Sequence, residues 1–323
     1  MIFILFLQLA LLLFLPGLTL PGAEFDSLIE PAEASAVTFS TLPPPAARLP
    51  TADERFSQPR KIRPESLGVR ISARSALVVD AGSGETLFSK DPDALLPVAS
   101  LTKLASALVF VESKPDWDSE VTIASSDMRG GAVEYLIPGE SVTAKELFEI
   151  ALVGSSNTAV AAMSRSTGLN AEEFVARMNA KTALLGLKRT SFVEPTGLNP
   201  ANVGTAREVA RLAQAAFLEP RIREAVTTRQ VTVRPKNSKG SRTRVIRSTD
   251  ALLSSFLAKP PYELIGGKTG SLGGGVGYHF VMSLENGESR PVIVVVLGSD
   301  SNAARFQDAK SLAVWTFDTW SWK

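Results

Sequence analysis

Ser100 and Lys103 lie three residues apart in the stretch PVASLTKLAS, and they have the types and spacing of a nucleophile and its base. If a helix begins near Ser100, residues three apart share one face, and the helix N-terminus favours a serine alkoxide. A lysine accepts the serine proton only when burial or a second cation lowers its pKa. Leu101, Leu104 and Ala105 give Lys103 mostly apolar neighbours. The alternative is a capping serine followed by an ordinary surface lysine.

A second pair of polar residues stands in GSSNTAV, where Ser155-Ser156-Asn157 is the only Ser-x-Asn of the chain. The pattern lies in a short connection between two predicted helices. Serine and asparagine both favour helix N-caps. Taken alone, Ser155 and Asn157 are therefore better explained as caps than as catalytic residues.

A third candidate is Lys268-Thr269-Gly270, in LIGGKTGSLGGGVGYHF. A phosphate-binding P-loop would need glycine at position 262, where the chain has Tyr262, and a helix after the lysine. The residues after the motif instead favour a strand. We predict that the motif lies at the start of a strand, where lysine and hydroxyl could hold a carboxylate while the edge pairs with an extended substrate. The alternative is a glycine-rich turn with a solvated lysine.

Composition excludes several kinds of site. The chain has no cysteine and one histidine, His279, so a thiolate nucleophile is excluded and a zinc hydrolase site with two or three histidines is not expected. His279 falls in a predicted strand, so we expect the base not to be histidine. No metal and no cofactor are predicted. The formal net charge of +1, without a basic run, predicts no nucleic-acid partner.

The N-terminal region divides into two predicted segments. Residues 1–23 are almost wholly apolar and indicate a signal peptide, with an uncleaved membrane anchor as the alternative. Residues 24–65 hold seven of the 20 prolines and indicate a linker. We therefore predict an exported protein, periplasmic or otherwise extracytoplasmic, that is membrane-anchored if the first segment is kept.

Residues 66–323 are predicted to form one folded catalytic domain. Hairpins are expected at 75–90, 229–248 and 277–299, the last with its turn at Asn286-Gly287. Helices are expected at 101–112, 143–154, 156–168, 169–185, 205–218 and 302–320. Strands at both ends around a helical block indicate an α+β fold, an antiparallel sheet flanked by helices with a mainly helical subdomain. The C-terminal tryptophans are expected to pack on the sheet.

In the order Ser-x-x-Lys, Ser-x-Asn and Lys-Thr-Gly, the three motifs are those of penicillin-recognising serine enzymes. From about residue 70 to the end, the chain resembles the D-alanyl-D-alanine carboxypeptidase family of low-molecular-mass penicillin-binding proteins, through stretches such as ALVVDAGSGETLFSKDPDALLPVASLTKLASALV and FVARMNAKTALLGLKRTSFVEPTGL. The resemblance implies a β-lactamase/transpeptidase-like fold. It also implies hydrolysis of the terminal D-Ala-D-Ala bond of peptidoglycan stem peptides, and acylation by β-lactams.

The resemblance also implies a role for each motif residue. Ser100 would be acylated, Lys103 would be its base, and Ser155 would pass the proton to the departing D-alanine. Substrate would be held by Asn157, Lys268, Thr269, Gly270 and Ser271, with the carboxylate on Lys268 and Thr269. The charge of Lys268 would keep Lys103 neutral, and the N–H groups of Ser100 and Ser271 would form the oxyanion hole.

Some features depart from the family pattern and leave alternatives open. Ser271 and His279 replace a commonly bulky and a commonly small residue, which bears on substrate preference. The family's second β domain and C-terminal amphipathic anchor are not expected. A β-lactamase is an alternative because EPTGLN, residues 194–199, imitates a Glu-Pro-x-Leu-Asn loop with one residue more. A D,D-endopeptidase or transpeptidase is another, and a non-catalytic peptidoglycan-binding or β-lactam-sensing domain is a third.

Overall fold

A computed structural model describes residues 58–237, 240, 242–287 and 290–322 of the chain. Its main element is an antiparallel sheet in the order β10-β11-β12-β2-β3. The strands are β2 (Ser75–Asp80), β3 (Thr86–Lys90), β10 (Tyr262–Leu272), β11 (Gly277–Asn286) and β12 (Val292–Ser299). All eight residues of β12 are buried because the strand is central and both faces are covered. β10 is an edge strand, so its outer backbone can pair with another chain.

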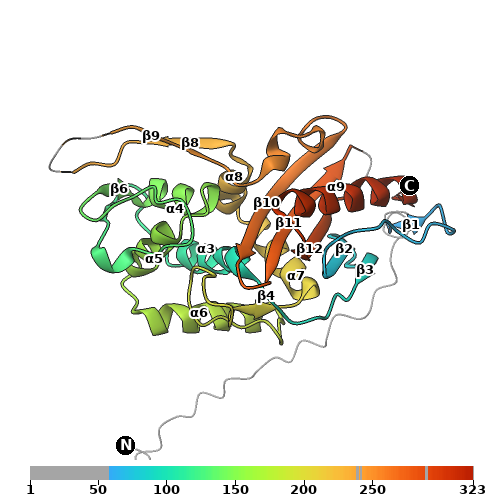
Figure 1. Ribbon diagram of the computed structural model, residues 1–323, viewed down its shortest axis with the longest axis horizontal. Coiled ribbons are helices and arrows are strands. Elements are labelled where there is room, and N and C mark those ends of the chain that lie inside the picture. Colours follow the sequence, from blue (N-terminus) through green and yellow to red (C-terminus); the bar gives the residue numbers. More distant parts are fainter. Residues whose placement is uncertain (1–57, 238–239, 241, 288–289, 323) are drawn as a thin grey trace, which may run out of the picture. The chain divides into compact units, whose positions relative to one another are not determined.

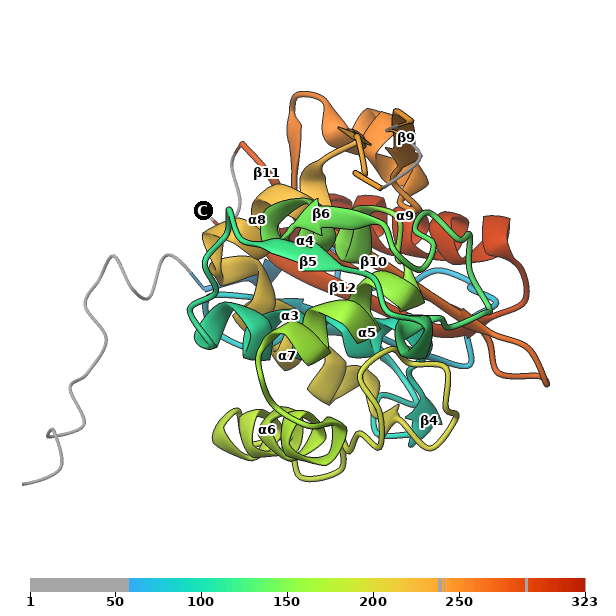
Figure 2. The ribbon, with the colours of Figure 1, turned by 90° about the vertical axis from the view of Figure 1, so that its left-hand side faces the viewer.

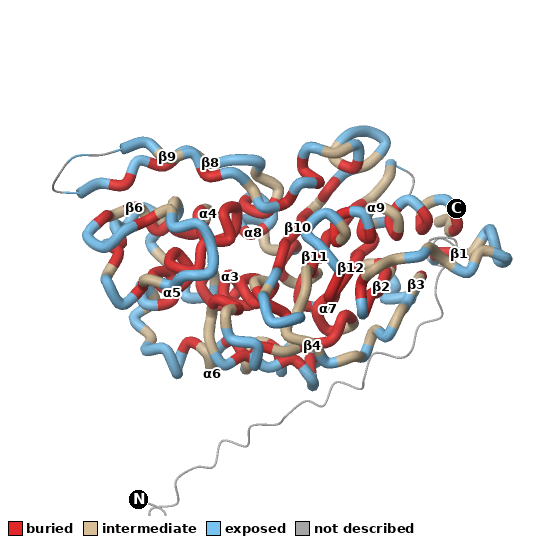
Figure 3. Tube along the Cα trace, in the orientation of Figure 1, coloured by how far each residue is buried: buried red, intermediate tan, exposed pale blue. Residues whose placement is uncertain are grey.

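Helices cover the two faces of this sheet. Helix α9 (Asn302–Thr319) packs on β11 and β12 on one face, over a core that includes Phe280 and Met282. Helices α7 (Ala206–Leu218) and α8 (Pro220–Thr227) pack on the other face, where α3 (Thr102–Glu112) also lies. Figures 1 and 3 show the sheet between these layers, with its central strands and α3 buried.

A mainly helical subdomain continues from α3. It contains α4 (Ala144–Val153), α5 (Asn157–Ser166) and α6 (Ala171–Leu184), which lie on the side of the unit that faces the viewer in Figure 2. The hydroxyl oxygen of Thr143 accepts from the N–H of Glu146, and Asn170 makes the same contact with Glu173, so these capping side chains fix the starts of α4 and α6.

Short elements complete the fold. A 3₁₀ turn, η1 (Ala99–Leu101), leads directly into α3, and η2 (Ser125–Asp127), η3 (Ala251–Ser254) and η4 (Phe256–Ala258) are further single turns. The remaining strands pair two by two: β1 (Arg60–Lys61) with β13 (Trp320–Ser321), β4 (Leu96–Pro97) with β7 (Val203–Gly204), β5 (Glu120–Thr122) with β6 (Ser141–Thr143), and β8 (Gln230–Val233) with β9 (Arg244–Arg247).

The predicted α+β architecture is confirmed, and so are the three hairpins and the helix after Ser100. Phe317, Trp320 and Trp322 pack against the core on the face of the sheet that α9 covers, as expected. Helix α8 was missed because its short sequence has no long apolar period. Arg60–Lys61 pairs with β13 inside the segment predicted as a linker, and the predicted boundary at residue 65 stays a prediction. Residues 1–23 lie outside the described residues.

The position of Lys268-Thr269-Gly270 differs from the prediction. The motif lies in the second half of β10, not at the start of a strand. The neighbouring glycines indicate close packing here: a methyl group on Gly266 would lie 2.8 Å from the Phe217 ring, and one on Gly267 would overlap Asp250 Oδ2. Glycine is required by these close approaches, so the strand runs through a stretch that resembles a turn in sequence. The prediction that the motif lies on an edge strand is nevertheless correct, because β10 is the outermost strand of the sheet on one side.

Candidate active site

Lys103 is the centre of the candidate site. It projects from the first turn of α3 and is completely buried. Its Nζ donates to Ser100 Oγ at 2.9 Å, to Asn157 Oδ1 at 2.7 Å and to the carbonyl oxygen of Thr196 at 2.6 Å. The turn η1 places Ser100 one helical turn before the lysine. A hydroxyl and an amine are therefore held within direct proton-transfer distance.

Burial lowers the pKa of Lys103 to about 7, and the charge of Glu194 opposes that shift. A large fraction of Lys103 is then a neutral amine near neutral pH, which can accept a proton from Ser100. The sequence offers burial or a second cation as the cause of this neutrality, and the family resemblance names Lys268 as the cation. The structure attributes it first to the loss of hydration around Lys103 itself, and the charge of Lys103 instead lowers the pKa of Lys268.

Ser155 lies in the connection between α4 and α5, and Asn157 is the first residue of α5. Ser155 has φ of +54°, a left-handed conformation that a serine rarely adopts. Its Oγ accepts from Lys268 Nζ at 2.7 Å. Asn157 accepts from Lys103 through Oδ1 and donates to the carbonyl oxygen of Gly130 through Nδ2, at 2.8 Å. Both ends of the Asn157 amide thus have protein partners, and its predicted contact with substrate stays a prediction.

The Lys-Thr-Gly motif lies against the start of α3. Lys268 is buried and donates to Ser155 Oγ and to the carbonyl oxygen of Thr269. A methyl group on Gly270 would lie 3.3 Å from the backbone nitrogen of Ser100. This close approach brings the edge of β10 beside the nucleophile and leaves Ser271 exposed at the strand's end. The predicted oxyanion hole of Ser100 and Ser271 is compatible with this geometry and stays a prediction.

The structure brings the predicted residues into one site. Hydrogen bonds link Ser100, Lys103 and Asn157 in one set. A second hydrogen bond joins Ser155 to Lys268. Ser155 is two residues before Asn157 in the chain, so the two groups of contacts are adjacent. Thr269 and Gly270 adjoin both sets through β10.

Two charged residues near β10 were missed. Asp250, at the start of η3, is buried, and burial raises its pKa to about 6 although the charges of Lys268 and Arg305 oppose the rise. Its Oδ2 has no hydrogen-bond partner among the described residues. Arg305 Nη1 donates to the carbonyl oxygen of Gly270 at 3.0 Å. A lone aspartate and a helix arginine form no sequence pattern, so no signal pointed to them.

The loop 194–199 contains the Thr196 carbonyl oxygen that accepts a hydrogen bond from Lys103 Nζ. Glu194 accepts from the N–H groups of Thr196, Gly197 and Asn199. Gly197 has φ of +88°, and a methyl group there would overlap the carbonyl oxygen of Ala99. Glu194 thus folds a tight loop whose Thr196 carbonyl holds Lys103. Because both of its oxygens accept hydrogen bonds, this glutamate is poorly placed to activate water as the β-lactamase alternative would require.

His279 is a packed side chain. It is buried in β11, and burial lowers its pKa to about 3. Its Nδ1 accepts from the N–H of Gly298 at 2.8 Å. The imidazole is therefore neutral, and it lies in a strand, as the sequence predicts.

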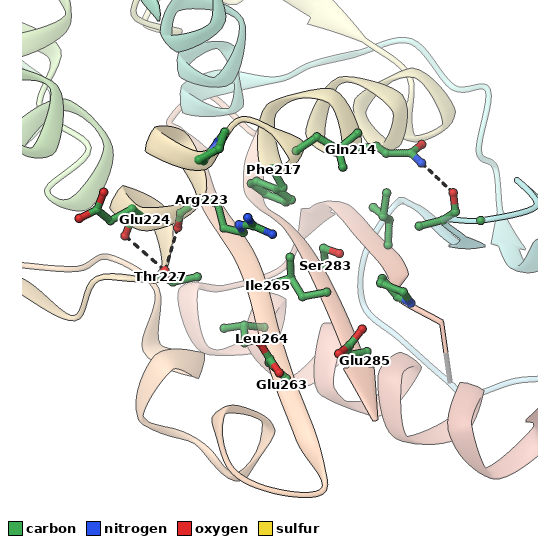
Figure 4. Close-up of a pocket in the computed structure, with 16 residues that line it drawn as sticks. Gln214, Phe217, Arg223, Glu224, Thr227, Glu263, Leu264, Ile265, Ser283 and Glu285 are labelled. Carbon is green, nitrogen blue, oxygen red and sulfur yellow. Dashed lines mark hydrogen bonds between the residues drawn. The ribbon is translucent and has the colours of Figure 1, made fainter. Parts of the chain in front are cut away.

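A separate cavity of about 710 Å³ lies between α7, α8 and the strands β10, β11 and β12. Figure 4 shows Phe217, Ile265 and Ser283 around it, with Glu263 and Glu285 at one side. Among the described residues that line it, Ser283 is the only serine and none is lysine or histidine, whereas Glu224, Glu263 and Glu285 are carboxylates. The cavity therefore has no serine–lysine pair and differs chemically from the Ser100 site.

Comparison with known proteins decides the family. A family model described as D-alanyl-D-alanine carboxypeptidase, Peptidase_S11, matches residues 60–301. This chain belongs to that family. It is a serine peptidase of the penicillin-binding type, as the motifs predict.

Relatives in the family carry different activity names. The chain is 33% identical over 283 residues to a D-alanyl-D-alanine endopeptidase of Pseudomonas aeruginosa, a match of 87% of this chain and 83% of that protein. It is 28% identical over 259 residues to the D-alanyl-D-alanine carboxypeptidase DacC of Escherichia coli, covering 76% of this chain and 62% of that protein.

A solved structure confirms the β-lactamase/transpeptidase-like fold. The crystal structure of the Streptomyces K15 DD-transpeptidase superposes with a TM-score of 0.72 at 29% identity, over 78% of this chain and all of that one. Among the described residues of this chain, no helix is both long and apolar enough to cross a membrane.

Proposed function

We propose that this chain hydrolyses D-alanyl-D-alanine bonds of peptidoglycan stem peptides through an acyl-enzyme on Ser100. One observation carries the proposal: Lys103 is a buried amine of lowered pKa, 2.9 Å from the Ser100 hydroxyl. Such an arrangement activates a serine without histidine. The family match to D-alanyl-D-alanine carboxypeptidases supports the substrate class.

The first half of the reaction forms the acyl-enzyme. Lys103 takes the proton of Ser100 as Oγ attacks the carbonyl carbon of the penultimate D-alanine. The C–N bond then breaks, and Ser155 gives a proton to the leaving nitrogen. Lys268 is placed to resupply Ser155, because its Nζ lies 2.7 Å from Ser155 Oγ. Lys103 then releases the proton that it took, which restores the one lost by the Ser155–Lys268 pair. As a neutral amine again, Lys103 serves as base when water hydrolyses the ester in the second half.

The substrate carboxylate is assigned to Lys268 and Thr269. An arriving anion raises the pKa of Lys268 and favours its ammonium form. Two neighbouring buried ammonium groups repel each other, so a charged Lys268 also favours a neutral Lys103. Binding of the carboxylate thereby prepares the base for attack.

A second candidate is endopeptidase activity on cross-links, which the match to the endopeptidase of Pseudomonas aeruginosa favours. The acyl-enzyme is the same, and only the leaving amine differs. A product assay separates the two: purified chain is incubated with a pentapeptide monomer and with a cross-linked dimer. Free D-alanine indicates carboxypeptidase action, and conversion of dimer to monomers indicates endopeptidase action. If wild-type chain forms neither product, or Ser100→Ala forms as much as wild type, the proposal is wrong.

We also propose that the chain is exported through residues 1–23 and acts outside the cytoplasm. The apolar character of that segment supports the proposal. Fractionation of cells that express the full chain, with and without residues 1–23, tests it. Equal amounts of both forms in the cytoplasm would contradict export.

A further inference from the structure

The cavity between α7, α8 and the sheet lies apart from the Ser100 site. No residue of the three motifs lines it, and its β10 wall is formed by residues 263–265. Ile265 precedes Lys268 by three residues, which is about 10 Å along a strand. A volume of about 710 Å³ is within the range of small-molecule sites. A ligand in this cavity would therefore leave the nucleophile uncovered.

Much of the cavity wall is apolar. Helix α7 and the strands β10 and β12 contribute Phe217, Ile265 and Ile293. Phe217 packs closely on β10, since a methyl group on Gly266 would lie 2.8 Å from its ring. Burial against such a wall favours the apolar part of a ligand.

Two polar side chains of the wall have partners within the chain. Gln214 Nε2 donates to the carbonyl oxygen of Ala81 at 2.7 Å, and the contact joins α7 to the end of β2. Thr227 Oγ1 donates to the carbonyl oxygen of Arg223 at 2.8 Å, within the last turn of α8. Figure 4 shows both contacts. These two donors are therefore used inside the fold.

Three polar side chains of β10 and β11 have no such partner. Ser283 is 5% exposed and lines the cavity, and its hydroxyl forms no hydrogen bond with another described residue. Glu263 and Glu285 line the cavity as well, and neither carboxylate forms an ion pair or a hydrogen bond within the described part of the chain. Figure 4 shows all three on the strand side of the cavity. Buried hydroxyl groups are usually hydrogen-bonded, so Ser283 offers a hydrogen bond to a group that enters the cavity.

Glu263 and Glu285, here called the carboxylate pair, lie directly opposite each other on β10 and β11. The neighbouring pair, Leu264 and Leu284, belongs to the core on the α9 face, so alternation places the carboxylate pair on the cavity face. Burial, together with the charge of Glu263, raises the pKa of Glu285. Like charges directly opposite in a sheet are destabilising. A cation bound between the two carboxylates would remove this repulsion.

The charged residues that line the cavity favour a cation, because three of the four are acidic. Arg223 extends from α8 toward the strands, whereas Glu224 turns its carboxylate away from them (Figure 4). The guanidinium of Arg290 reaches the rim at Gly82 on the β2 side, two strands away from β11. The carboxylate pair is thus the acidic end of a largely apolar cavity.

We propose that this cavity binds a small molecule that carries a primary ammonium group on an apolar body. The ammonium group has three N–H donors, and Glu263, Glu285 and Ser283 are its acceptors. The apolar body packs between Phe217 and Ile265. The ligand thereby removes the repulsion within the carboxylate pair and gives the buried hydroxyl a partner.

The test uses three probes of nearly one shape that end in a cation, a neutral group and an anion: 4-phenylbutylamine, 4-phenylbutanol and 4-phenylbutanoate. Each is titrated into the full chain and followed by saturation-transfer NMR. A probe of about 11 non-hydrogen atoms is expected to bind with a Kd of about 1 mM. We expect the amine to bind about tenfold more tightly than the alcohol, since two partly exposed ion pairs each contribute a small increment. The carboxylate is expected to bind most weakly.

Two variants locate the binding. Glu263→Gln/Glu285→Gln is expected to weaken amine binding about tenfold and to leave alcohol binding unchanged. Ile265→Trp fills the cavity and is expected to weaken both probes. Circular dichroism checks that each variant is folded. Without a probe, Glu263→Gln/Glu285→Gln should melt about 1 to 2 °C higher than wild type, because the like-charge pair is gone.

Two matched controls separate the cavity from charge in general. Glu65→Gln/Glu172→Gln removes two exposed carboxylates elsewhere, so the change of net charge is the same, and amine binding should not change. Arg223→Gln removes the opposite charge from the cavity wall and should tighten amine binding about twofold.

Several outcomes overturn the inference. One is an amine that binds no more tightly than the alcohol, and another is full amine affinity in Glu263→Gln/Glu285→Gln. An equal loss in Glu65→Gln/Glu172→Gln would assign the preference to net charge alone. Unchanged amine binding in a folded Ile265→Trp variant would place the probe elsewhere on the chain. β-Lactam acylation of Ser100 is a separate readout, because its absence in wild-type chain rejects the proposed function and leaves the cavity untouched.

Discussion

The site contains two serine–lysine pairs that share their chemistry and differ in their surroundings. Lys103 is bound by Ser100 Oγ, Asn157 Oδ1 and a backbone carbonyl oxygen, all uncharged acceptors. Lys268 is bound by Ser155 Oγ and a carbonyl oxygen, with the charges of Arg305 and Asp250 near enough to shift its pKa. Burial lowers the pKa of both lysines. They differ in the group that each is proposed to meet: Lys103 donates to the Ser100 hydroxyl, whereas Lys268 belongs to the motif proposed to bind the substrate carboxylate.

This difference explains how one pocket can use two lysines without having both charged. Holding two ammonium groups close together away from water is unfavourable. Without substrate, at most one of the two lysines is therefore expected to be charged, and under the proposal a bound substrate carboxylate favours the charge on Lys268. Which of the two lysines is charged thus depends on the charge of the substrate as well as on the fold.

The largest effect is expected for Lys103→Arg. Arginine keeps a positive charge but stays protonated at any ordinary pH, so it cannot accept the Ser100 proton. We expect acylation by a β-lactam to slow about 1000-fold, the range of a general base. Stopped-flow acylation measures it, with circular dichroism as the control for folding. A loss of less than tenfold in a folded variant would mean that Lys103 is not the base.

A smaller effect is expected for Lys268→Ala, which separates the second pair from the first. Loss of a buried charge that pairs with a carboxylate reduces kcat/KM about 100-fold. A substrate whose terminal carboxylate is amidated should be affected much less. Equal losses on the acid and the amide would remove carboxylate binding from the role of Lys268.

The pH dependence of acylation distinguishes the lysines further. Protonated Lys103 cannot act as a base, so the rate should fall as pH drops through about 7 and level off above it. Asp250, whose pKa is about 6, also titrates on the acid side. The profile of Asp250→Asn should therefore keep its limb near 7. A limb that disappears in Asp250→Asn would assign it to the carboxyl group and not to Lys103.

The smallest effect is expected from Asp250→Asn on substrate binding. Removing this carboxylate lowers the pKa of Lys268 further, because its negative charge raises that pKa. We expect KM for carboxylate substrates to rise about threefold, with kcat little changed, since about 0.7 kcal/mol corresponds to that factor. The asparagine keeps the Oδ1 that accepts from the N–H of Leu252. A tenfold fall in kcat at constant KM would place Asp250 in the chemical step.

The sequence carried the three motifs and the helix that presents Ser100 and Lys103, because short spacings and apolar periods are local signals. It could not carry what depends on contacts between distant segments. Asp250 and Arg305 reach β10 from η3 and α9 without any pattern of their own. The glycines of β10 imitate a turn, since nothing local shows that Phe217 and Asp250 press on them. The cause of the low Lys103 pKa likewise follows from burial, which is a property of the assembled fold.

The most direct test of the central claim is the intact mass of the chain after exposure to a β-lactam. Wild-type chain and Ser100→Ala are treated alike, and peptide mapping locates any adduct. We predict one adduct on the wild-type chain, at Ser100, and none on Ser100→Ala. An adduct of the same mass on Ser100→Ala would contradict the assignment of the nucleophile.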